Sequence, residues 1–183
     1  MDSDFITIYE TYHQDVYQFL FYMVKNQETA EDLMQEVYIR VMNSLNKFQG
    51  KSSEKTWLFA IARNVALDYF RKQKGWKNKL FQKFDWSNSK IIDSTQPLPE
   101  EIAVQNEESR LLYHCLDRCT IDQKSVIILR YIQDLSIAET AATLNWSESK
   151  VKTTQHRAMK QLKKMLNEED KKGELTSENA ELG

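Results

Sequence analysis

The fold is indicated most clearly by residues 136–166, SIAETAATLNWSESKVKTTQHRAMKQLKKML. Its first nine residues place apolar side chains at helical spacing, and Ser136 and Glu139 have the spacing of a capping box. Asn145-Trp146-Ser147 then predicts a tight connection, in which Ser147 caps a longer, basic helix. A short helix, a three-residue turn and a longer helix form the helix-turn-helix pattern.

The second helix of this pattern predicts contact with DNA. In a helix-turn-helix the second helix enters the major groove, and its N-terminal residues face the base edges. The residues expected on that face are Lys150, Lys152, Thr153, His156 and Arg157. Lysine and arginine donate to guanine or phosphate, and threonine reaches a base edge or the backbone. An ordinary helical hairpin with a basic exterior is the alternative that this pattern leaves open.

The composition of the whole chain favours long helices. Only 4 Gly and 2 Pro occur in 183 residues, too few turn residues for a strand-rich barrel or sandwich. The longest apolar run, residues 19–24, is far shorter than the ~20 residues of a membrane span, and the N-terminus lacks the basic start of a signal peptide. We therefore expect a soluble, cytoplasmic protein without direct membrane insertion.

Charge is divided unevenly along the chain, although the net charge is only -2. Residues 47–83 hold ten basic residues against two acidic ones, and residues 147–164 hold six against one. Residues 165–183 have the opposite sign, with two lysines against six acids. Two basic segments indicate two places that meet phosphate, because the local field attracts a polyanion. Two solvated surface helices are the alternative.

The spacing of apolar residues divides the chain into parts. An apolar residue recurs every three or four positions in three helical segments before residue 75, and again in four segments after residue 103. The fold class predicted is all-α, with two small helical domains joined by a flexible linker. The predicted parts are a first domain at 1–74, a linker with aromatic residues at 75–103, a second domain at 104–167 and an acidic disordered tail at 168–183.

The order of these parts resembles the extracytoplasmic-function group of the sigma-70 family of RNA polymerase sigma factors, and within it the sigma-X type of bacilli. Residues 30–38, AEDLMQEVY, resemble the family's region 2.2. This resemblance implies that Asp32, Gln35 and Glu36 contact core RNA polymerase. Paired carboxylates acting as acid and base would need a pocket and a histidine or metal set, which this segment lacks. We therefore predict no catalytic residue, no enzymatic activity and no small-molecule substrate.

Residues 48–72 resemble regions 2.3 and 2.4, which recognise and open the minus-10 promoter element. By this resemblance the loop before the tryptophan helix receives an extruded base, and the helix meets the upstream part of the element. The implied residues are Lys51, Ser52 and Ser53 for base capture, Asn64 for the duplex edge, and Arg63, Arg71 and Lys72 for phosphates. Trp57 has two interpretations, a DNA contact or a core residue, and its spacing with Leu58 and Ile61 favours the core.

The helix-turn-helix resembles region 4.2, which reads the minus-35 element, with Lys152, Thr153, His156 and Arg157 at the reading positions. Asn145 stands where the family usually has glycine, Ser149-Lys150 where many members have Gly-Thr, and Met159 where arginine is common. Asparagine tolerates the left-handed conformation, so we expect the turn to survive. His114, Cys115 and Cys119 cannot surround an ion from one helix, so we predict neither a metal nor a cofactor.

The resemblance implies an alternative sigma factor that binds core RNA polymerase and directs initiation at minus-10 and minus-35 elements of promoter DNA. It also implies control by an anti-sigma factor, often membrane-bound, in an envelope or stress response. Without polymerase, we expect the two domains to move independently. A stand-alone helix-turn-helix regulator remains the alternative, as does an adaptor that binds only protein.

Overall fold

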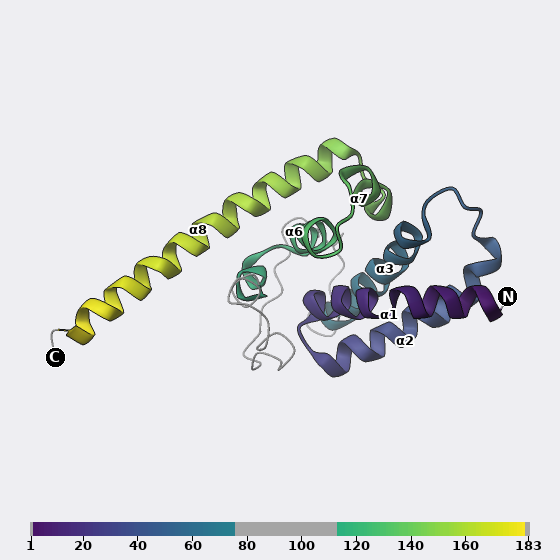
Figure 1. Ribbon diagram of the computed structural model, residues 1–183, viewed down its shortest axis with the longest axis horizontal. Helices are drawn as coiled ribbons and strands as arrows, with labels where there is room; N and C mark the ends of the chain where they lie inside the picture. Colours follow the sequence, from purple (N-terminus) through teal and green to yellow (C-terminus); the bar gives the residue numbers. More distant parts are fainter. Residues whose placement is uncertain (1, 76–112, 182–183) are drawn as a thin grey trace.

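The first domain of the computed structural model is a bundle of three long helices (Figure 1). The structure describes residues 2–75 and 113–181, with side chains from 4 to 74 and from 113 to 167. The elements of this domain are α1 (Asp2–Val24), α2 (Gln27–Ser44), the 3-10 turn η1 (Leu45–Lys47) and α3 (Glu54–Gly75). The three helices predicted before residue 75 are therefore confirmed.

Apolar side chains from all three helices form one core. Phe19 of α1 and Phe59 of α3 are fully buried, with ring centroids 5.5 Å apart in an edge-to-face arrangement. Burial of one such side chain contributes about 1.5–3 kcal/mol. α2 adds the buried residues Ala30, Leu33, Val37, Tyr38 and Val41. Because this stripe faces the core, the opposite side of α2 is left to solvent.

The second domain contains the helix-turn-helix and the helical elements that pack against it. Its described elements are η2 (Leu116–Arg118), α6 (Ile121–Ile127), the π-helical turn η3 (Ile128–Ile132), α7 (Ile137–Leu144) and α8 (Glu148–Glu181). Both α6 and α7 pack against α8. The first helix predicted for this domain lies largely outside the described residues. The later segments are helical as predicted, although η3 replaces regular α-helix at residues 128–132.

The linker predicted at 75–103, with its aromatic residues, lies outside the described residues apart from Gly75. The tail after Asn167 was expected to be disordered, whereas α8 continues through it to Glu181. Glutamate and lysine make up half of residues 168–181, and these residues can extend a helix that is already nucleated.

The described helices carry charge along their length. α1, for example, has Asp4 and Glu10 exposed and Asp15 half-buried. Within residues 2–75 and 113–181, no helix combines the length and the apolar character needed to cross a membrane.

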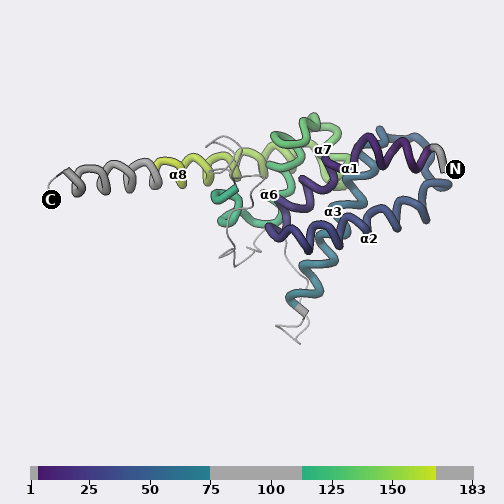
Figure 2. Tube along the Cα trace, turned by 60° about the horizontal axis from the view of Figure 1, so that its bottom comes forward, coloured from purple at the N-terminus to yellow at the C-terminus, as the bar shows by residue number. Residues whose placement is uncertain are grey.

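The two domains pack against each other. α7 lies against α3, while η3 and α6 lie against α1 (Figures 1 and 2). Gln133 Nε2, at the end of η3, donates to the Asp15 carbonyl (3.3 Å) and to Gln18 Oε1 (3.0 Å) of α1. Lys55 Nζ of α3 donates to the Gln133 carbonyl (2.8 Å). Polar side chains thus bridge the two domains in this conformation, and the independent movement expected of the free domains stays a prediction.

Candidate nucleic-acid and polymerase interfaces

Three local features fix the turn of the helix-turn-helix, namely a capping box, a left-handed residue and an N-cap. Ser136 Oγ accepts from Glu139 N (3.1 Å) and Glu139 Oε2 accepts from Ser136 N (2.8 Å), which completes the predicted capping box. Asn145 ends α7 in the left-handed conformation, at φ 54 and ψ 47. Ser147 Oγ accepts from Lys150 N (3.2 Å) at the start of α8. Together these contacts fix the direction in which α8 leaves α7.

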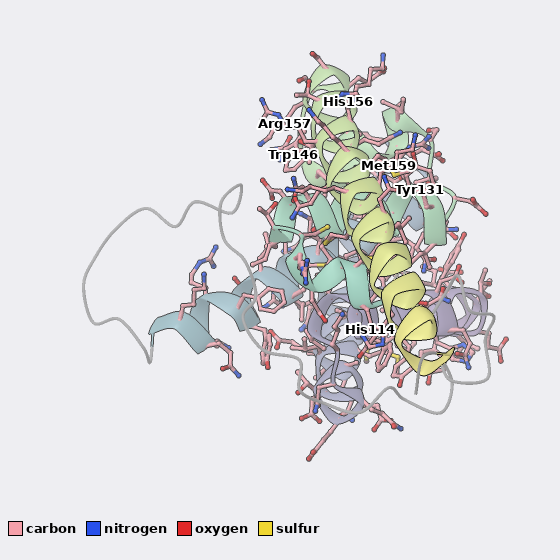
Figure 3. All side chains as sticks on the ribbon, turned by 90° about the vertical axis from the view of Figure 1, so that its left-hand side faces the viewer. His114, Tyr131, Trp146, His156, Arg157 and Met159 are labelled. Carbon is pink, nitrogen blue, oxygen red and sulfur yellow. The ribbon has the colours of Figure 1, made fainter. Side chains whose placement is uncertain are left out.

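The face of α8 that points away from the core carries all five residues predicted to read DNA. Val151 and Ala158 are fully buried against the domain, and Leu162 and Met165 are nearly so. This stripe leaves exposed, on the other side, Lys150, Lys152, Thr153, His156 and Arg157. Figure 3 shows His156 and Arg157 near Trp146, with Met159 and Tyr131 on the other flank of the helix.

The local contacts of this face are weak and exchangeable. Lys150 Nζ lies 3.8 Å from the centre of the Trp146 ring. Lys152 forms an exposed ion pair with Glu148 at 3.7 Å, and such surface pairs are worth only about 0–1 kcal/mol. Thr153 Oγ1 donates to the Ser149 carbonyl (2.9 Å). These cations and the hydroxyl can therefore turn toward a phosphate or base edge at little cost.

A concavity of about 510 Å³ lies beside the same face. Thr120 and Gln123, at the start of α6, form one wall, and Asp122 also lines it. Hydroxyl and cationic side chains from the beginning of α8 form the rest, including Lys150 and Arg157. The polar surface next to the reading face is thus wider than the five predicted residues alone.

The loop predicted to capture a base runs from Phe48 to α3. Gly50 has φ +64, and a Cβ at this position would meet nothing within 4 Å, so its backbone is open to solvent. Lys51 is exposed and Ser52 half-buried. Ser53 already has a structural role, because its Oγ accepts from Thr56 N (3.1 Å) at the start of α3.

Trp57 belongs mainly to the core, which is the interpretation that its spacing with Leu58 and Ile61 favours. Its indole is partly buried against the core cluster, and its ring centroid lies 4.7 Å from that of Phe48. The indole therefore fastens the loop to α3.

Three of the polar residues predicted on α3 are exposed, namely Asn64, Arg71 and Lys72. Arg71 Nη1 pairs with Asp68 Oδ1 at 2.6 Å, and Asp68 Oδ2 accepts from Arg40 of α2 at 3.0 Å. Asp68 therefore links the exposed end of α3 to α2 while Arg71 remains at the surface.

Arg63, the fourth polar residue predicted on α3, is not exposed. Its side chain is 9% exposed, and Nη2 pairs with Asp122 Oδ1 of α6 at 3.2 Å. The guanidinium also lies 5.6 Å from the centre of the Trp146 ring. Burial lowers the pKa of Arg63, while Asp122 opposes that shift. The prediction that Arg63 holds a phosphate does not fit this conformation, because the second domain covers the side chain.

The solvent face of α2 presents the residues predicted to bind polymerase. Asp32 and Gln35 are exposed, and Glu36 Oε1 accepts from Arg40 Nη2 at 2.5 Å. Two apolar residues missing from the sequence prediction continue the same stripe, Ile39 at 58% and Met42 at 60% exposed. Positions 32, 35, 39 and 42 share one helical face, but the spacing alone does not tell an exposed apolar residue from a core residue.

The described residues contain no group of three or more metal-ligating side chains that could hold an ion. Cys115 and Cys119 are buried thiols outside any disulfide bond, and burial raises the pKa of Cys119 to about 11. Both behave as small apolar side chains.

Comparison with known proteins places this geometry in a family. The profile described as Sigma-70 region 2 matches residues 8–75, and that described as Sigma-70, region 4 matches residues 109–162. The chain belongs to the sigma-70 family. This sigma factor is 58% identical over 166 residues to the ECF RNA polymerase sigma factor SigX of Bacillus subtilis (strain 168), across 91% of this chain and 85% of that relative. The predicted resemblance to extracytoplasmic-function sigma factors is confirmed.

More distant relatives agree with this assignment. RNA polymerase sigma factor YlaC of Bacillus subtilis (strain 168) is 35% identical over 159 residues, covering 87% of this sigma factor and 90% of YlaC. The fold resembles that of the sigma factor RpoE, solved in complex with the anti-sigma factor NepR from Bartonella quintana. That likeness has a TM-score of 0.69 and 23% identity, over 90% of this chain and 97% of RpoE.

Proposed function

We propose that this sigma factor binds core RNA polymerase through α2 and directs it to promoters by reading the minus-35 element with α8 and the minus-10 element with α3. The observation that carries the proposal is the exposed reading face of α8, held in place by a capped helix-turn-helix. Family membership favours this function over a stand-alone regulator. The protein then acts without catalysis of its own, in the cytoplasm, where polymerase and promoter DNA are found.

The minus-35 part is tested by transcription in vitro with core polymerase and a cognate promoter. Lys152→Ala combined with Arg157→Ala should lower specific initiation strongly, since each lost base-edge contact costs about 1–3 kcal/mol. The matched control is Lys163→Ala with Lys164→Ala, which removes the same charge from α8 farther along the helix. If both pairs weaken initiation equally, α8 attracts DNA only by charge and does not read sequence.

The polymerase part rests on the exposed face of α2. One acid and one amide within a single helical turn can meet a basic helical partner together. Glu36, held by Arg40, adds a second carboxylate to that face. Asp32→Ala with Gln35→Ala should weaken binding to core polymerase in a pull-down assay. The control removes an acid and an amide from the exposed side of α1, through Glu10→Ala with Gln14→Ala. Full transcription by the α2 variant would favour the stand-alone regulator.

For the minus-10 element we assign Lys51, Ser52 and Ser53 to an extruded base and Asn64 to the duplex edge. Phosphates are held by Arg71 and Lys72, and by Arg63 once the second domain no longer covers it. Extruding a base costs a few kcal/mol, which contacts in the holoenzyme offset. Permanganate footprinting of the open complex tests this assignment. Asn64→Ala should reduce opening without reducing core binding, and unchanged opening would remove Asn64 from the interface.

Regulation by an anti-sigma factor also belongs to this proposal. RpoE was solved with NepR, and CnrH, which shares the fold at a TM-score of 0.64 and 18% identity, was solved with the cytosolic domain of CnrY. Co-purification with a candidate anti-sigma protein from the same genome, followed by loss of transcription on its addition, is the direct test.

A further inference from the structure

We propose that the described conformation is a closed, autoinhibited state, in which Asp122 of the second domain occupies Arg63 in place of a minus-10 phosphate. This inference rests on the proposed function, because it takes Arg63 to be a phosphate-binding residue in the holoenzyme. Access to the minus-10 strand then requires the second domain to leave α3.

The contact resembles what a nucleic acid would offer. Asp122 presents a carboxylate oxygen 3.2 Å from Nη2 of Arg63, and both side chains are less than 10% exposed. The Trp146 ring lies against the same guanidinium at 5.6 Å. A carboxylate and an aromatic ring are the protein counterparts of a phosphate and a base, and arginine binds both pairs by the same charge and stacking interactions.

The Arg63 contact is also incomplete. Nε of Arg63 is buried and has no hydrogen-bond partner among the described residues. Arginine can donate two parallel hydrogen bonds to a phosphate, so DNA would satisfy a donor that the closed state leaves unused. Asp122 thus occupies Nη2 of Arg63 and leaves Nε for a phosphate.

The rest of the domain interface combines aromatic and polar contacts, since the buried Tyr113 packs against Phe21 and Tyr22 of α1. Gln133 binds the backbone of Asp15 and the side chain of Gln18, and its own carbonyl accepts from Lys55. Lys25, directly after α1, pairs with Asp117 on the other side of the interface. Water can replace these hydrogen bonds when the domains separate, so the polar contacts oppose opening only weakly.

Occlusion follows from the packing of the elements. α7 lies directly on α3, so the helix-turn-helix covers the part of α3 that carries Arg63. If only a small fraction of the molecules is open, the apparent affinity for DNA equals the affinity of the open form multiplied by that fraction. Free sigma factor should therefore bind a minus-10 strand poorly, and any change that opens it should raise that affinity.

The test compares Asp122→Asn with wild type as the free, full-length chain. Asp122→Asn keeps the shape of the side chain but removes its charge. Asp134→Asn is the matched control, because Asp134 is exposed and asparagine tolerates its φ of 55. Small-angle X-ray scattering measures compactness, and fluorescence anisotropy measures binding of a single-stranded minus-10 oligonucleotide. We expect Asp122→Asn to expand the protein and to raise oligonucleotide affinity about tenfold or more, with Asp134→Asn unchanged.

A second variant guards against misfolding. Gln133→Ala removes interface contacts without touching Arg63, and should also expand the protein and raise affinity, while circular dichroism checks that helix content is kept. Variants that stay as compact and bind as weakly as wild type would overturn the closed state. Expansion without tighter binding would overturn the masking of Arg63.

Transcription by the wild-type holoenzyme is measured in parallel. An active holoenzyme together with unresponsive variants rejects the closed state and leaves the sigma function intact. An inactive holoenzyme together with variants that expand and bind rejects the proposed function and supports the closed state.

Discussion

Replacing Lys124 with methionine should stabilise the protein and remove much of its pH dependence near neutrality. The Lys124 side chain, on α6, is 1% exposed. Burial, and then repulsion by Lys25, lower the pKa of Lys124 from 10.5 to about 7, although Asp117 and Cys119 favour the charged form. Methionine has a similar length and carries no charge to desolvate.

The magnitude follows from proton linkage. Because the folded pKa of Lys124 lies below the unfolded one, the unfolded chain binds more protons between pH 7 and 10.5, and stability rises with pH across that window. The protonated lysine opposes folding by on the order of 5 kcal/mol at low pH. Between pH 6.5 and 8.5 this residue should add about 2 kcal/mol to the free energy of unfolding. Lys124→Met should lack that rise and exceed wild type most at pH 6.5.

Urea denaturation followed by circular dichroism at pH 6.5, 7.5 and 8.5 measures the effect. The upper limit stays well below the raised pKa values of Cys119, about 11, and Tyr113, about 12. Lys152→Met, at an exposed lysine, is the control and should follow wild type. Parallel pH slopes for wild type and Lys124→Met would refute the buried, neutral lysine.

Further substitutions probe the core and the turn, all by urea or thermal unfolding. Phe59→Ala should destabilise the chain by about 3–5 kcal/mol, because it leaves a cavity against Phe19; a loss below about 1 kcal/mol would mean that the ring is not buried. Ser136→Ala removes the cap of α7 and should cost about 1 kcal/mol, whereas Ser149→Ala, at an exposed position on α8, should have little effect. Asn145→Gly should be tolerated and Asn145→Ala should cost about 1 kcal/mol; equal stability of the two would contradict the left-handed turn.

Local features of this fold were predictable because their causes are local. The helical faces follow from apolar residues spaced by three and four. The cap at Ser136 depends on side chains that bond within three residues, and the turn at Asn145 on backbone bonds to Ala141 and Ala142. The start of α2 follows the same rule, since Asn26 Oδ1 accepts from Thr29 N at 2.7 Å.

The domain arrangement was not predictable from these patterns. Arg63 meets Asp122 across 59 positions of sequence, and Gln133 meets Gln18 across 115. Nothing near Arg63 in the chain marks it as buried, since a lone arginine beside apolar residues is usually solvated. The burial of Lys124 is equally unmarked in the sequence around it. Buried polar residues obtain their partners from tertiary packing, which spacing along one helix does not encode.

The residues of the candidate site also fall into those that periodicity along one helix predicts and those that only tertiary packing reveals. The reading face of α8 and the acidic start of α2 are stripes on single helices, so periodicity placed them together. Ile39 and Met42 were missed because exposed apolar residues look like core residues in a sequence, and only packing shows that they remain uncovered.

At the π-helical turn η3, the number of residues in the chain matters more for the structure than which side chains they carry. Gln133 N bonds to the Ile128 carbonyl (3.0 Å), one residue farther back than in an α-helix. Such a turn is equivalent to an α-helix with one inserted residue. Deleting a residue from 128–132 would rotate Gln133 by about 100° and turn it away from α1. Among relatives, a single insertion or deletion here would therefore re-aim the helix-turn-helix relative to α6 and α1 while leaving the sequence of the helix-turn-helix unchanged.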